Sequence, residues 1–224
     1  MKLRNRIIHP LLLSGFGTGQ ADEKQQQLRI VVTHAGKIIS MDSVEKAFTM
    51  VKRSNFVPDE LVGQVDIDAP LPIGHGQTIS QPTTVQMMLE WLEAQPGDKV
   101  LDIGSGSGWT TALLAYIVGP NGRVFAVERI LELVEFGRDN AKRAGVRNAK
   151  FYEAGKALGL QKYAPFDRIL VSAAAQKFPE ELLNQLKDGG KLVIPVNNDI
   201  LEVEKDSGET TTKVHRGFMF VPLL

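Results

Sequence analysis

The stretch VLDIGSGSGW, residues 100–109, decides the fold of this 224-residue chain. An apolar strand pattern runs into three alternating glycines, Gly104, Gly106 and Gly108, and a helical pattern follows them. Glycine at alternate positions lets the backbone bend sharply and lets a ligand lie against it with no Cβ in the way. A plain strand-to-helix turn seldom needs three glycines at fixed spacing, so the pattern predicts a ligand-binding loop.

The loop favours S-adenosylmethionine over a dinucleotide. The dinucleotide fingerprint has its third glycine at the sixth position of the loop, where this chain has the bulky Trp109. S-adenosylmethionine carries a sulfonium, an amino acid head group and a ribose diol, so carboxylates around it are favourable. We expect Asp102 to face the charged head group and Glu128, at the end of the next strand, to accept both ribose hydroxyls. A solvated charge at a strand end is the alternative for Glu128.

Short apolar runs alternate with longer helical ones on both sides of this loop. The predicted strands are 99–103, 123–128, 150–153, 167–172 and 191–196, and the predicted helices are 108–118, 131–145 and 178–187. Turn residues at 119–122 and 188–190 separate neighbouring elements. This order predicts an α/β fold with a doubly wound, mainly parallel sheet. Beyond it, segments 200–205 and 213–221 predict a closing antiparallel hairpin.

The chain before the sheet divides into an arm and a helical part. Residues 14–27 are rich in Gly and Gln, polar and aperiodic, so 1–40 is predicted to be a flexible or irregular arm. A helix is predicted from Asp42, and a loop then leads to GHGQTISQP, residues 74–82, which precedes a helix over 82–95. We expect one domain over 41–224, with the helical part at 41–97 and the sheet at 98–224.

Composition excludes several functional classes. The 26 basic and 26 acidic residues cancel, which removes the positive field expected of a nucleic-acid-binding protein. With no cysteine there is no disulfide, thiolate metal site or cysteine nucleophile, and we predict no metal site. His9 and Pro10 interrupt the apolar run near the N-terminus, so it does not reach the length of a membrane span. We expect a soluble, cytoplasmic protein without nucleic-acid or membrane partners.

Residues 71–82, LPIGHGQTISQP, resemble the signature of the protein-L-isoaspartate (D-aspartate) O-methyltransferases, and VLDIGSGSGW resembles their glycine loop. Further matches lie at 164–167, 172–175, 185–186, 189–190 and 220–223. The resemblance covers about residues 42–224 and implies a Rossmann-like, S-adenosylmethionine-dependent methyltransferase. That family methylates the free carboxylate of L-isoaspartyl and D-aspartyl residues in damaged proteins and so begins their repair. The implied partners are damaged proteins or peptides, and we expect a monomer.

The resemblance also implies a set of site residues. Ser80 would be the active-site hydroxyl, although its place before Pro82 also suits an N-cap of the following helix, and the two roles are compatible. We expect His75 to be an exposed loop side chain rather than a base. The predicted cofactor site comprises Gln77, Thr78, Ile79, Ser80, Asp102, Gly104, Ser105, Gly106, Gly108, Glu128, Arg129, Glu153 and Ala154.

Two segments depart from the family pattern. Where the family has Gly-Asp-Gly after the third strand, with the aspartate reading the adenine amino group, residues 154–156 are Ala-Gly-Lys, and Glu153 is the nearest carboxylate. Where the family has Ala-Tyr-x-Asp, residues 65–68 are Val-Asp-Ile-Asp, without the aromatic residue. Three functions therefore remain: isoaspartyl methylation, methyl transfer to another acceptor such as a small acid or tRNA, and cofactor binding without repair activity. The neutral net charge disfavours tRNA.

Overall fold

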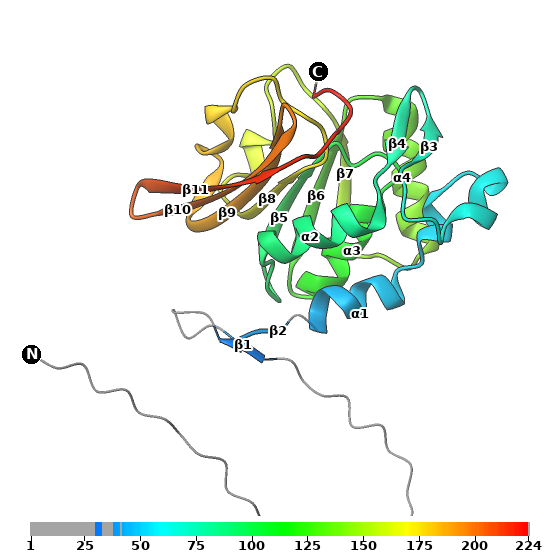
Figure 1. Cartoon of the computed structure of the whole chain (residues 1–224), viewed down its shortest axis with the longest axis horizontal. Helices are drawn as coiled ribbons and strands as arrows, with labels where there is room; N and C mark the ends of the chain where they lie inside the picture. Colours follow the sequence, from blue (N-terminus) through cyan, green and yellow to red (C-terminus); the bar gives the residue numbers. More distant parts are fainter. Residues whose placement is uncertain (1–29, 33–37, 41, 224) are drawn as a thin grey trace, which may run out of the picture.

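The structure, a computed structural model, describes residues 30–32, 38–40 and 42–223 (Figure 1). Its centre is a seven-stranded sheet in the order β11-β10-β9-β8-β5-β6-β7. The bounds are β5 Lys99–Ile103, β6 Arg123–Glu128, β7 Ala149–Glu153, β8 Phe166–Val171, β9 Leu186–Val196, β10 Asp199–Asp206 and β11 Glu209–Arg216. Strands β5 to β9 pair in parallel, and β10 is antiparallel to both β9 and β11. The predicted mainly parallel sheet is confirmed.

The strand order reverses at β5, which has β6 on one side and β8 on the other. In open α/β sheets, such a reversal opens a crevice at the carboxyl ends of the strands, where ligands bind. The loops that follow β5 and its two neighbours, β6 and β8, are therefore the places to look for a site.

Helices α2 Pro82–Leu92, α3 Trp109–Val118 and α4 Leu131–Arg143 cover one face of the sheet, and α1 Asp42–Met50 packs on α2 and α3 from outside. Helix α3 is apolar on nearly every side because it lies between α1 and the sheet. Strand residues alternate between the two faces, so Val100 contacts the helical layer while Leu101 and Ile103 belong to a second core on the opposite face. That second core is covered by connecting segments and short 3-10 helices.

The helix predicted over 178–187 is wrong. The structure has one 3-10 turn there, η4 Glu180–Leu182, and Leu186 already pairs with Phe166 as the first residue of β9. Residues 188–190, predicted as a turn, lie inside β9, where the register with β8 shifts. Burial of Leu182 and Leu186 in the second core produces the helix-like apolar spacing without a helix.

The segment before α2 is a hairpin and not the predicted loop. Strand β3 Leu71–Gly74 pairs antiparallel with β4 Gln77–Ile79, and His75 and Gly76 form the tip with φ of 53° and 70°. Two consecutive residues with positive φ are typical of the tight turns that match the twist of paired strands. His75 is exposed at this tip, as expected. The 3-10 helices η1 Arg53–Phe56 and η2 Asp59–Gln64 precede the hairpin.

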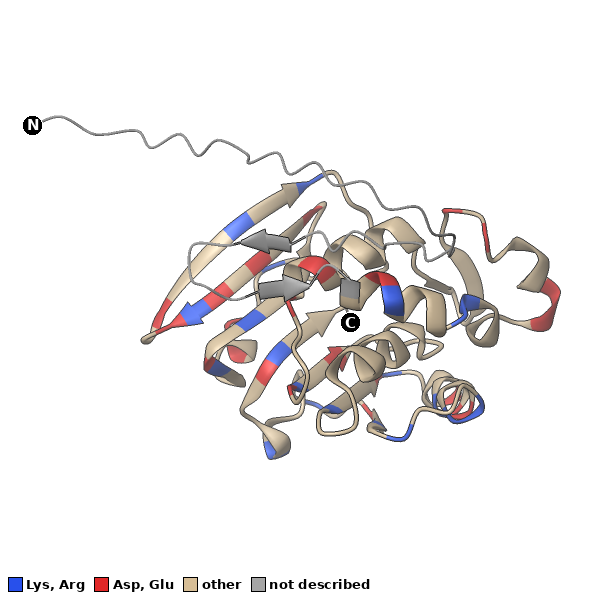
Figure 2. Cartoon of the chain, turned by 90° about the horizontal axis from the view of Figure 1, so that it is seen from below, with Lys and Arg blue, Asp and Glu red and all other residues tan. Residues whose placement is uncertain are grey.

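Two further strands, β1 Ile30–Val32 and β2 Ile38–Ser40, pair antiparallel within the predicted N-terminal arm. The rest of 1–40 lies outside the described residues, so the irregular arm stays a prediction. The C-terminal hairpin is present, but its second strand runs from Glu209 to Arg216, earlier than the predicted 213–221. In the described part of the chain, no helix has the length and apolar character needed to cross a membrane. Acidic and basic residues are interspersed over the same elements (Figure 2).

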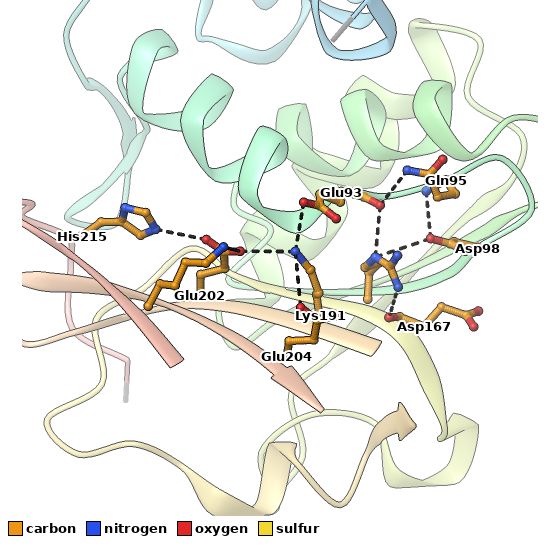
Figure 3. Close-up of polar contacts among 10 residues, drawn as sticks. Glu93, Gln95, Asp98, Asp167, Lys191, Glu202, Glu204 and His215 are labelled. Atoms are coloured by element: carbon orange, nitrogen blue, oxygen red, sulfur yellow. Dashed lines mark hydrogen bonds and ion pairs between the residues drawn. The ribbon is translucent and has the colours of Figure 1, made fainter. Parts of the chain in front are cut away.

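A buried charge network ties the end of α2 to the sheet (Figure 3). Lys191 Nζ lies 3.0 Å from Glu93 Oε1 and 3.3 Å from Glu202 Oε1, and its side chain is 7% exposed. Glu202 also contacts Lys213 and His215, whose ring stacks on Trp91 of α2 with centroids 3.7 Å apart. Burial raises the pKa of Glu202, but its three cationic or hydrogen-bonding partners outweigh this and hold it below its usual value.

Candidate active site

A cavity of about 330 Å³ opens at the carboxyl ends of the parallel strands. The segments that line it include 77–80 at β4, 103–107 at the end of β5, 127–129 at the end of β6, 154–159 after β7 and 221–223 near the C-terminus. The cavity therefore lies at the reversal of strand order, where the sheet topology places a ligand. The Gln-Thr-Ile-Ser segment and the glycine loop, which are far apart in the sequence, both line this cavity.

Ten of the thirteen predicted site residues line this cavity. They are Gln77, Thr78, Ile79, Ser80, Gly104, Ser105, Gly106, Glu128, Arg129 and Ala154. The other three, Asp102, Gly108 and Glu153, are not among its lining residues. Glu153 has an exposed side chain, Gly108 lies at the contact between the loop and α4, and Asp102 is buried beneath the loop.

Gly108 is needed for packing against α4. A Cβ on Gly108 would come within 2.7 Å of the carbonyl oxygen of Gly137, and a Cβ on Gly137 would come within 2.8 Å of the carbonyl oxygen of Gly106. One turn further along α4, Asn140 Nδ2 donates a 3.0 Å hydrogen bond to the carbonyl of Ser107. The loop therefore takes its shape from close backbone contact with α4. Gly108 lies on this contact and not on the cavity wall.

Asp102 is fully buried beneath the loop and is not among the residues that line the cavity. Its Oδ2 accepts a 2.6 Å hydrogen bond from Thr111 Oγ1, and its Oδ1 has no partner within the protein. Burial raises the pKa of Asp102 to about 7, the Thr111 hydrogen bond opposes this shift, and the charge of Glu128 adds to it. The side chain joins the end of β5 to the first turn of α3, and its contact with the charged head group of a ligand stays a prediction.

Glu128 holds the glycine loop in place. Its Oε2 accepts the Gly106 N–H at 3.0 Å, and its Oε1 accepts the N–H groups of Arg129 and Ile130 at 2.8 and 3.1 Å. The residue is 7% exposed, so it is not a solvated strand-end charge. A carboxylate accepts about four hydrogen bonds, and these three leave about one acceptor position for a ligand hydroxyl.

Ser80 is not the cap of α2. The N-cap residue is Gln81, whose side chain makes no capping hydrogen bond. The N–H of Thr83, in the first turn of α2, donates to Asp68 Oδ1 at 2.9 Å. Asp68 Oδ2 also accepts hydrogen bonds from Thr83 Oγ1 and Gln81 Nε2. These three bonds, led by the one from the Thr83 backbone, lower the pKa of Asp68. The half-buried Ser80 side chain is left to the cavity.

Sequence reasoning missed two parts of the wall. Residues 155–159, which follow the predicted Ala154, are held by buried Gln185, whose Nε2 donates to the Leu158 carbonyl and whose Oε1 accepts the Leu160 N–H, both at 2.8 Å. Residues 221–223 pair with Ala174, whose N–H donates to the Val221 carbonyl at 2.8 Å. The Phe-Val-Pro-Leu match near the C-terminus was an available signal for the second segment. Glu181 of η4 also lines the cavity, and no sequence pattern marked it.

Comparisons with known proteins agree with this arrangement. Residues 23–224 match the model of the family described as protein-L-isoaspartate(D-aspartate) O-methyltransferase. The chain is 46% identical over 192 residues to a protein-L-isoaspartate O-methyltransferase of Methanopyrus kandleri, covering 83% of this chain and 85% of the relative. It is 44% identical over 193 residues to the enzyme of the same name from Pyrococcus horikoshii, covering 84% and 87% of the two chains.

A solved structure from Plasmodium falciparum, described as a protein-L-isoaspartate O-methyltransferase in complex with S-adenosyl-L-homocysteine, is also similar. Its TM-score is 0.74 at 29% identity, and the match covers 82% of this chain and 90% of that one. Most of the fold is therefore shared with that structure. The family match, the close relatives and this structural neighbour place the chain in the protein-L-isoaspartate(D-aspartate) O-methyltransferase family.

Proposed function

We propose that this protein transfers the methyl group of S-adenosylmethionine to the free carboxylate of L-isoaspartyl and D-aspartyl residues in damaged proteins. The observation that carries the proposal is the single cavity shared by the glycine loop, Glu128 and Ser80. Membership of the family points to the same reaction. The acceptor is then a protein or peptide, and the product is a methyl ester that can collapse to a succinimide.

The residues around the cavity fit this cofactor. Gly104 and Gly106 have positive φ and present bare backbone to the cavity. Ser105 Oγ is buried without a partner in the protein, as expected of a group that bonds to a ligand. Glu128 keeps about one acceptor position for a ribose hydroxyl. When bound, S-adenosylmethionine supplies an electrophilic methyl group on a sulfonium.

The reaction requires alignment more than proton transfer. The acceptor carboxylate is already ionised near neutral pH, so no general base is needed. Ser80 orients the carboxylate by donating a hydrogen bond from its hydroxyl, and in-line geometry then supplies most of the rate enhancement. Because an anion and a cation become two neutral products, exclusion of water by the apolar walls at Ile73 and Ile79 favours the transition state over the separated ions.

The test is a methyl-transfer assay with radiolabelled S-adenosylmethionine. We expect base-labile label on a peptide that contains an isoaspartyl residue and none on the same peptide with aspartate. Calorimetry with S-adenosylhomocysteine measures cofactor binding independently. Tight binding without label on the isoaspartyl peptide would refute the proposal and support cofactor binding without repair activity.

Ser80→Ala tests the role of the hydroxyl. We expect kcat to fall roughly 10- to 100-fold because the acceptor is less well aligned, while affinity for S-adenosylhomocysteine stays unchanged. Ser207→Ala is the matched control, since Ser207 lies in the exposed turn of the β10–β11 hairpin and should leave kcat unchanged. Wild-type rates in Ser80→Ala would refute the assigned role. The monomeric state, the cytoplasmic location and the absence of nucleic-acid partners stay predictions.

A further inference from the structure

Arg53 is a buried cation that contacts the backbone of Ser80. It belongs to η1 and is 7% exposed. Its Nη2 donates hydrogen bonds to the carbonyl oxygens of Ala69 at 2.8 Å and Ser80 at 3.1 Å, and its Nη1 donates to those of Val65 and Ile67, both at 3.1 Å. One planar guanidinium therefore holds four main-chain carbonyls from two separate segments.

The same guanidinium lies over the side chain of Trp109. Its Cζ is 5.4 Å from the centroid of the ring, which is the geometry of a cation–π contact. Trp109 is 3% exposed, begins α3 directly after the glycine loop, and lines the cavity. Arg53 thus joins segment 65–69, Ser80 and the end of the glycine loop, which are far apart in the sequence.

Ser80 occupies a place where regular structure does not fix it. Strand β4 ends at Ile79 and α2 begins at Pro82, so the Ser80 carbonyl lies between the two elements. Pro82 has no N–H that could donate to a nearby carbonyl. The hydrogen bond from Arg53 takes the place of a ladder or helix bond for that carbonyl. Segment 65–69 in turn carries Asp68, which caps α2 through Thr83. Arg53 therefore holds the Ser80 carbonyl directly, and it holds the segment that caps the helix after Ser80 through the carbonyls on either side of Asp68.

Burial of this charge has an energetic cost. Desolvation lowers the pKa of the Arg53 guanidinium, the charge of Asp68 opposes that shift, and Nε has no hydrogen-bond partner. An apolar side chain could fill this space without that cost, but it would leave four carbonyls without a donor. The buried guanidinium therefore fixes the backbone geometry of segment 65–69 and Ser80, at a cost in desolvation.

We infer that Arg53 is a positioning residue that sets the orientation of Ser80 toward the cavity. The inference rests on the proposed function, because it gives Arg53 its effect through Ser80. Lysine at this position keeps the charge but offers three donors on one point and no planar fork, so it cannot hold four carbonyls in the same geometry.

The test compares Arg53→Lys with Arg168→Lys and with Ser80→Ala. Arg168 is the matched control because it is also a buried arginine that holds main-chain carbonyls, those of Glu93 and Asp167, at the far end of α2. Methyl transfer to an isoaspartyl peptide is measured well below the melting temperature of each variant. We expect Arg53→Lys to lower kcat roughly tenfold and Arg168→Lys to leave kcat within about twofold of wild type.

A double-mutant cycle separates positioning from a general structural effect. If Arg53 acts through Ser80, the variant with both Arg53→Lys and Ser80→Ala has the same kcat as Ser80→Ala alone. Multiplied losses, an unchanged kcat in Arg53→Lys, or unfolding of Arg53→Lys where Arg168→Lys stays folded would each overturn the inference and leave the proposed function standing. An unchanged kcat in Ser80→Ala would instead refute the role of Ser80, and the inference with it.

Discussion

Gly137→Ala is expected to destabilise the protein although the residue lies in a helix. Replacing an interior helical glycine by alanine normally stabilises by about 1 kcal/mol. Here the added Cβ would lie 2.8 Å from the Gly106 carbonyl oxygen, 3.2 Å from Gly108 N and 3.1 Å from Phe151 Cε1. Two of these atoms belong to the backbone of the glycine loop, so the clash is relieved only if α4 or the loop moves.

The size of the effect follows from two opposing contributions. Overpacking of this kind costs about 1–3 kcal/mol, which exceeds the helix-propensity gain and leaves a net loss of about 1 kcal/mol. For a chain of 224 residues, that loss lowers the melting temperature by about 2–4 °C. Displacement of Gly106 also distorts the cavity wall. If about 1.4 kcal/mol opposes ligand binding, affinity for S-adenosylhomocysteine falls about tenfold.

Thermal unfolding and calorimetry with S-adenosylhomocysteine measure the two effects. Asp139→Ala is the matched control because Asp139 is an exposed residue of the same helix. It gains helix propensity of up to about 0.7 kcal/mol with no clash, so its melting temperature should stay equal or rise. A Gly137→Ala variant with a higher melting temperature and unchanged affinity would refute the argument that the loop is shaped by contact with α4.

Two further predictions concern buried charge. Because the pKa of Asp102 is raised to about 7 in the folded protein, from about 3.9 in an unfolded chain, its protonated form stabilises the fold below pH 4 and this contribution is lost as pH rises through 7. Relative to Asp102→Asn, the free energy of unfolding of the wild type should therefore fall by on the order of 4 kcal/mol between pH 4 and pH 8, and parallel urea-unfolding profiles would contradict this. Lys191→Met should lower the free energy of unfolding by about 3 kcal/mol, because Glu93 and Glu202 lose a shared buried cation. An unchanged melting temperature would contradict this and show that Lys213 and His215 are enough to stabilise the Glu202 carboxylate.

The parallel core of the fold was predictable because its strands are buried on both faces. Strands β5 and β6 have mostly apolar interiors, and glycine-containing turns at 104–108 and 119–122 lie between them, whereas β8 is apolar only in its second half, after Asp167 and Arg168. The expected helix at 178–187 failed because apolar spacing does not distinguish a helix from a 3-10 turn that runs into a strand. The β3–β4 hairpin was missed because its strands are short, although Gly74, His75 and Gly76 carried the turn signal.

The site was predictable in part. The spacing of the glycines and Glu128 located the cavity, and only the resemblance brought Gln77–Ile79 and Ser80 to it. The burial of Asp102 beneath the loop was not predictable, because a sequence does not reveal whether a strand-end carboxylate points into the ligand space or beneath the loop. Glu181 reaches the cavity through tertiary contacts that no local pattern encodes, whereas residues 221–223 belong to a family match that gave no indication of their place at the cavity.

The Glu128 carboxylate accepts hydrogen bonds from three backbone N–H groups. This changes how an acidic residue at the end of the strand after a glycine loop is interpreted. Selection for a well-folded loop would preserve the carboxylate even in a descendant that had stopped binding any nucleoside. An acidic residue at this position of a sequence therefore indicates that the glycine loop is folded in this way, and it is weaker evidence that a ligand binds there. A glutamine there would turn an N–H toward another N–H, so the damage from that exchange would begin before any ligand arrived.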